Sequence, residues 1–72
     1  MNRQEWLETT KECLLDIERR INECHGMIDH FIALGNRDEI RYWRRVLQDC
    51  KVKKRNLKRE MKNTMQLGEA VI

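Results

Sequence analysis

The sequence has no proline and only three glycines in 72 residues, so it is nearly free of the residues that interrupt helices and build turns. It also has no long apolar run, because charged residues recur every few positions. The absence of such a run argues against a signal peptide or a membrane span. What remains is 38% charged residues with abundant Glu, Lys, Arg, Leu and Met. This composition is typical of long helices.

Cysteine is scarce as well, and the three cysteines cannot all pair within one chain. We therefore expect free thiols in a reducing cytoplasm. No Cys-x-x-Cys or His-x-x-x-His spacing occurs, and Cys24, Cys50, His25 and His30 are not expected to converge on one point. The sequence predicts buried cysteines that act as small apolar residues, with no metal and no cofactor.

A chain of this length forms one small domain, which we place at residues 1–72. Below roughly 70–80 residues, a lone core rarely supplies more than ~3–5 kcal/mol. Such a domain usually needs disulfides, a metal or self-association. Because the cysteines and histidines suggest neither of the first two, self-association is the expected remedy.

Apolar residues recur with a 3-4 alternation in both halves of the chain, which is the pattern of a coiled-coil seam. The seam of the first half consists of Leu7, Thr10, Leu14, Ile17, Ile21, Cys24, Ile28 and Phe31. The seam of the second half consists of Ile40, Trp43, Leu47, Cys50, Lys54, Leu57, Met61 and Thr64.

The two seams differ in phase, which argues against one continuous helix. Gly35 between them suits a left-handed helix end, and Asn36 with Glu39 suits the start of a second helix. Asn2 and Glu5 repeat this capping pattern at the start of the chain. We predict an all-α, antiparallel two-helix hairpin with helices at about 3–34 and 37–67, a turn at 35–36, and a frayed tail at 68–72 that begins at Gly68.

An apolar stripe runs beside the seam on one flank only, although a two-stranded seam does not require one. We call it the apolar flank: Trp6, Cys13, Met27, Leu34, Val46 and Leu67, interrupted by Arg20 and Lys53. We expect the opposite flank to be polar, with Lys11, Glu18, His25, Arg44, Lys51 and Lys58. The stripe predicts a homodimer in which two hairpins form a four-helix bundle. The alternative is that Trp6 and Leu34 merely cover the ends of the hairpin.

Charge is divided unevenly along the chain. Residues 1–36 contain four basic and seven acidic side chains, whereas residues 37–63 contain eleven basic and four acidic ones. The basic face predicted on the second helix consists of Arg41, Arg44, Arg45, Lys51, Arg55, Lys58, Arg59 and Lys62. It could bind phosphates or an acidic partner. The alternative is an ordinary solvated helix face, and no nucleic-acid-binding motif is present.

Two residues depart from the pattern. Gly26 lies inside the first helix at an outward position, where it costs roughly 1 kcal/mol relative to alanine. It marks either a bend or close approach of a partner, or it has no role. Lys54 lies in the seam opposite Ile17, where it either extends to solvent or sets the pairing register.

No catalytic constellation or phosphate-binding loop occurs, and a filled helical seam offers no concave site for tuned acids and bases. The sequence therefore predicts a non-enzymatic interaction protein: a homodimeric regulator, inhibitor or adaptor that binds a larger protein partner. Nucleic-acid binding by the basic face is the alternative, and a role in assembly or scaffolding is the second alternative.

Overall fold

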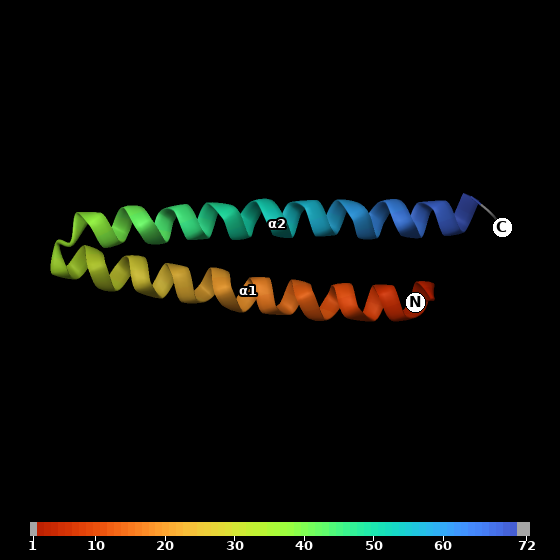
Figure 1. The fold of residues 1–72 in the computed structure, drawn as a ribbon, viewed down its shortest axis with the longest axis horizontal. Coiled ribbons are helices and arrows are strands. Elements are labelled where there is room, and N and C mark those ends of the chain that lie inside the picture. The colour runs from red at the N-terminus through yellow and green to blue at the C-terminus, as the bar shows by residue number, and fades with distance from the viewer. Residues whose placement is uncertain (1, 71–72) are drawn as a thin grey trace.

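The computed structural model describes the backbone of residues 2–70 and the side chains of residues 2–64. Helix α1 spans Arg3–Leu34 and helix α2 spans Arg37–Ala70. Figure 1 shows the two helices side by side and antiparallel, with the turn at one end and the two free helix ends at the other. The predicted two-helix hairpin is confirmed.

The predicted end of the second helix is displaced. Helix α2 continues through Gly68 to Ala70, beyond the boundary expected at residue 67. A glycine terminates a helix only where it adopts the left-handed conformation, and Gly68 instead lies within α2. The last part of the predicted frayed tail, residues 71–72, lies outside the described residues.

Both helices begin at the asparagines that the sequence indicated. The backbone N–H of Glu5 donates to Oδ1 of Asn2 at 2.8 Å, and Nδ2 of Asn2 donates to Oε1 of Glu5 at 3.4 Å. At the second helix, the backbone N–H of Glu39 donates to Oδ1 of Asn36 at 3.3 Å. Each asparagine thus satisfies a backbone donor that has no partner within its own helix.

The turn depends on one glycine. Gly35 has φ 70° and ψ 22°, in the left-handed region that residues with a Cβ avoid. This conformation lets the backbone N–H of Gly35 donate to the carbonyl of Ile32 at 3.1 Å. The N–H of Asn36 donates to the carbonyl of Phe31 at 3.0 Å. The chain can reverse here without leaving these carbonyls unpaired.

All sixteen predicted seam residues are buried or half-buried, which confirms the face that each helix turns toward the other. Only Thr10, Cys24 and Ile28 are buried among the side chains described, and of these only Cys24 is completely so. The Thr10 hydroxyl donates to the carbonyl of Trp6 at 2.7 Å, so this polar seam residue is satisfied within its own helix. The two helices therefore leave most of the seam side chains partly exposed to solvent.

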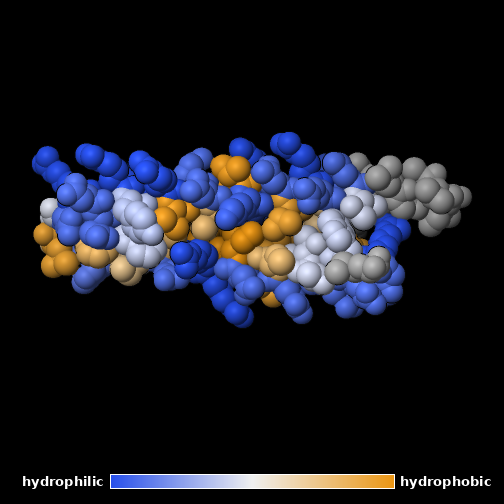
Figure 2. All heavy atoms as spheres, in the orientation of Figure 1, coloured by the Kyte–Doolittle hydropathy of each residue, from blue (hydrophilic) through white to orange (hydrophobic). Residues whose placement is uncertain are grey.

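The hairpin is a thin rod. Its principal extents are 56 × 16 × 15 Å and its radius of gyration is 16.5 Å, against about 11 Å for a compact domain of this length. Figure 2 shows apolar side chains along the middle of one face, between the helices, and charged side chains along both outer edges. A rod of this shape has almost no interior away from its seam.

Candidate interaction surfaces

The apolar flank is only partly covered by the hairpin. Trp6, Met27 and Val46 are half-buried, whereas Cys13 is exposed and Leu34 is 65% exposed. The side chain of Leu67, the last predicted member, lies outside those described. The hairpin thus leaves Leu34 largely uncovered and covers Trp6 in part.

The same flank is hollowed near its middle. A cavity of about 470 Å³ opens between the helices. Its apolar wall comes from Ile17 and Leu57 of the two seams, and its rim includes Cys13 of the apolar flank. The polar groups around it belong to Asp16, Lys53, Asn56 and Glu60. This depression could accept an apolar side chain from another helix.

The basic face lies where the sequence placed it. All eight residues are exposed along α2. None of them forms an ion pair within the described part of the chain, where basic side chains pair instead in Arg19–Asp16 and Lys54–Glu18. Tyr42, the aromatic neighbour of the face, packs its ring edge-to-face against Trp43 at 5.4 Å. Tyr42 is exposed near the start of the face, and the face is otherwise a row of cations without an ion pair among the described residues.

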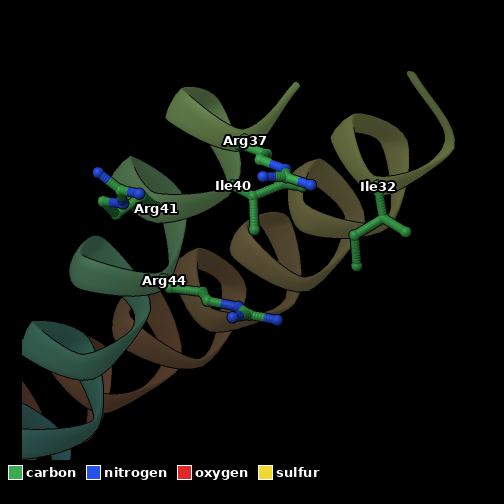
Figure 3. Close-up of a pocket in the computed structure, with 5 residues that line it drawn as sticks. All are labelled: Ile32, Arg37, Ile40, Arg41 and Arg44. Carbon is green, nitrogen blue, oxygen red and sulfur yellow. The ribbon is translucent and has the colours of Figure 1, made fainter. Parts of the chain in front are cut away.

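The flank opposite the apolar one is not wholly polar, contrary to expectation. Ile32 lies on it and is 52% exposed. It lines a cavity of about 340 Å³ beside the turn, together with Ile40 and the arginines Arg37, Arg41 and Arg44. Figure 3 shows Arg37 and Arg44 extending past Ile40 toward the side on which Ile32 lies, whereas Arg41 points away.

Sequence reasoning missed two residues of this cavity, Ile32 and Arg37. The spacing of Arg37 and Arg44, seven residues apart, places both arginines on one face of α2. Ile32 lies on α1, so only the packing of the two helices brings it beside these arginines. We call this site the arginine pocket.

The cysteines divide as the seam predicts. Cys24 is fully buried, Cys50 is half-buried and Cys13 is exposed. Burial raises the pKa of the Cys24 thiol above its ordinary value of 9.0, and the neighbouring Cys50 adds to the rise. A thiol of this kind is a poor nucleophile at neutral pH, because the thiolate is the reactive form.

One buried donor has no partner in the seam. The indole Nε1 of Trp43 is inaccessible to solvent and forms no hydrogen bond. A buried polar group left in this state costs about 1–3 kcal/mol. The unsatisfied donor lies in the seam layer of Trp43, the second seam residue of α2 after the turn.

Within residues 2–70 no helix is long and apolar enough to cross a membrane. Among the side chains of residues 2–64, no group of three His, Cys, Asp or Glu is placed to hold a metal ion. The surfaces with distinct chemistry are thus the apolar flank, the basic face and the arginine pocket. Comparisons with protein families, with curated proteins and with solved structures find no match to this chain.

Proposed function

We propose that this protein is a non-enzymatic interaction protein: a regulator, inhibitor or adaptor that dimerises through its apolar flank and binds a larger protein partner. Two hairpins would pack into a four-helix bundle, and the basic face of α2 would remain outside. The observation that carries the proposal is the open seam: thirteen of its sixteen residues are only half-buried by the hairpin itself.

The exposed area of the chain supports self-association. The hairpin exposes 5924 Å², whereas a compact monomer of 8.8 kDa exposes about 4,800 Å². The excess of roughly 1,100 Å² is close to the ~800 Å² that each partner contributes to a standard protein interface. One interface of ordinary size would therefore bring the chain to the exposure of a compact protein.

The apolar flank is the part of the surface best suited to that interface. Leu34 and Cys13 are free to contact a second copy, and the cavity beside Cys13 can receive one of its apolar side chains. Burying apolar area is worth about 25 cal/mol per Å². The lone hairpin cannot obtain this stabilisation from its own side chains.

Sedimentation equilibrium tests the proposal. We expect a dimer over concentrations from about 1 to 100 µM, with thermal stability that rises with concentration by mass action. Leu34→Glu places a charge in the proposed interface and should weaken dimerisation at least about ten-fold, since burying an unpaired carboxylate is costly.

Leu15→Glu is the matched control. Leu15 is 55% exposed, similar to the 65% of Leu34, but it lies away from the apolar flank. It should leave the dimer intact. A chain that stays monomeric at the highest concentration would refute the proposal. Equal weakening by the two glutamates would show that another surface is used.

Nucleic-acid binding is the second candidate. It is favoured by one observation, the eight unpaired cations along α2. Its rank is lowered because Tyr42 is the one aromatic side chain exposed along this face in the described residues, whereas proteins that bind single strands commonly stack successive bases on several rings. A role in assembly or scaffolding would use the same apolar flank, and no separate observation favours it.

A further inference from the structure

The arginine pocket combines two chemistries in one small space. Its floor is aliphatic, formed by Ile32 from the last turn of α1 and Ile40 from the first turns of α2. Three arginines also line the pocket, of which Arg37 and Arg44 extend toward the side of Ile32 and Arg41 points away (Figure 3). The cavity of about 340 Å³ lies at the small end of the range for ligand sites, which begins near 300 Å³.

The three arginines have no acidic partner. None of them forms an ion pair or a side-chain hydrogen bond within residues 2–64, although Asp38 and Glu39 are close in sequence. Each guanidinium therefore keeps its full set of N–H donors in a geometry that matches a carboxylate. The pocket presents positive charge that nothing in the described hairpin neutralises.

The exposed floor distinguishes this site from an ordinary basic surface. Ile32 keeps about half of its side chain in contact with water beside these charges. In Figure 3, Arg37 and Arg44 extend past Ile40 toward the side occupied by Ile32. A ligand that paired with both guanidinium groups would therefore lie over the isoleucines and bury them.

We infer that the arginine pocket binds an acidic segment of a protein partner, in which a bulky aliphatic side chain is flanked by aspartate or glutamate. The aliphatic group enters between Ile32 and Ile40, and the flanking carboxylates pair with Arg37 and Arg44. This inference rests on the proposed interaction function and names the chemistry of the partner. It does not require dimerisation, because the pocket lies on the flank opposite the proposed dimer interface.

The pocket fits a peptide better than a nucleic acid. Phosphates would satisfy the guanidinium groups, but bases stack on aromatic rings, and no aromatic side chain lines this cavity. An aliphatic side chain is stabilised when it is removed from water, and the isoleucine floor offers that burial. The arginines complement acidic side chains and the isoleucines complement an aliphatic one, so the pocket matches a peptide segment that has both.

Fluorescence anisotropy with defined peptides tests the inference on the full chain. The probe is a labelled short peptide whose central leucine is flanked by glutamates, and its matched control carries serine in place of leucine. We expect the leucine peptide to bind at least about five-fold more tightly, since it can bury an aliphatic side chain against the isoleucines and the serine peptide cannot.

Arg37→Gln with Arg44→Gln should weaken binding of the leucine peptide about ten-fold or more. Ile32→Ser should remove the preference for leucine over serine while leaving the charge-driven part of binding. Arg55→Gln with Arg59→Gln is the matched control: it removes the same charge from α2 outside the pocket and should change binding less than about two-fold. All five side chains are exposed, so the hairpin should persist, which circular dichroism can verify.

Three results would overturn the inference. Equal affinity for the leucine and serine peptides would mean attraction by charge alone. Tighter binding of an oligouridylate that depends on Arg37 and Arg44 would assign the pocket to phosphate. A change in sedimentation mass in the Arg37→Gln, Arg44→Gln variant would assign it to self-association.

Failure of this inference can be told apart from failure of the proposed dimer. If the chain dimerises but binds neither peptide, only the inference about the pocket is contradicted. If the chain is monomeric but still prefers the leucine peptide, only the proposed dimer is contradicted. A chain that neither dimerises nor binds either peptide contradicts both.

Discussion

The ammonium group of Lys54 lies 3.4 Å from a carboxylate oxygen of Glu18, across the seam between α2 and α1. Lys54 is the one charged residue among the seam positions, and it is half-buried there. Its aliphatic stem lies in the seam while its charged end reaches the flank where Glu18 is located. The pair therefore shows how the hairpin tolerates a lysine among apolar layers.

This geometry predicts that Lys54→Leu stabilises the protein. Glu18 is nearly half exposed, so the ion pair is worth between 0 and about 1 kcal/mol, whereas a leucine in the same layer would bury more apolar area. We expect the free energy of unfolding to rise by about 1 kcal/mol in urea denaturation. Lys58→Leu, on the exposed flank, should change it by less than about 0.5 kcal/mol.

The opposite outcome is informative too. If Lys54 sets the register of pairing, Lys54→Leu should yield a mixture of oligomers, as a lost polar seam residue does in coiled coils. We expect a single sedimenting species. A mixture, or a loss of stability, would assign Lys54 the register-setting role.

Gly26 and Gly35 predict opposite effects for the same substitution. A Cβ added at either glycine would meet no atom within 4 Å, so packing does not decide the result. Gly26 lies in regular α1 helix, and Gly26→Ala should raise the free energy of unfolding by about 1 kcal/mol. Gly35 has φ 70°, and Gly35→Ala should lower it by about 1–2 kcal/mol. Urea denaturation at matched protein concentration measures both.

These two variants also test whether Gly26 has a role. If a partner helix approaches closely at this position, Gly26→Ala would stabilise the hairpin less than expected or would weaken dimerisation. The expected result is a full gain in stability with an unchanged dimer. Gly35→Ala that proved neutral would show that the turn does not need its left-handed residue.

The raised pKa of the Cys24 thiol predicts a loss of stability at alkaline pH. The unfolded chain releases this proton near the ordinary pKa of 9.0, whereas the buried thiol holds it to higher pH. The contribution is therefore complete below that value and is lost as the pH rises through the raised pKa of the folded state. Unfolding free energies measured from about pH 7 to 10.5 should fall.

Cys24→Ala separates this effect from the lysines that titrate in the same range. The variant should be less stable at neutral pH, because it leaves a small cavity in the seam. Its stability should decline less steeply than that of the parent chain above pH 9.0. Parallel curves would contradict the assignment to Cys24.

In the native state, a thiol reagent should label Cys24 and Cys50 slowly. It should label Cys13 at a rate that falls when the dimer forms.

The ranking of the two candidate functions predicts weak nucleic-acid binding. Purified protein should bind mixed RNA or DNA only non-specifically, with a dissociation constant of ~10⁻⁴–10⁻⁶ M at physiological salt. Arg55→Gln with Arg59→Gln should alter that weak binding little. A submicromolar complex that depends on both arginines, with a log–log salt slope steeper than roughly −1.5, would reverse the ranking.

The hairpin could be predicted from local features of the chain. The helix starts at Asn2 and Asn36 and the reversal at Gly35 are local features, because each depends on a hydrogen bond or a backbone angle within a few residues. The seam was equally readable, since the 3-4 alternation puts side chains on one face of a helix regardless of what that face meets. The end of α2 was misplaced because Gly68 permits a stop but does not impose one.

The residues that meet on each surface depend on how the two helices pack. Ile32 and Arg37 share a pocket because the turn brings the start of α2 beside the last turn of α1. Lys54 pairs with Glu18 because the packing of the two helices places these side chains on the same side of the seam. The open state of Leu34 and the unpaired indole of Trp43 likewise depend on how closely the helices approach. Periodicity assigns a residue to a face, but the packing of one helix against the other determines which side chains that face covers and which it leaves to a partner.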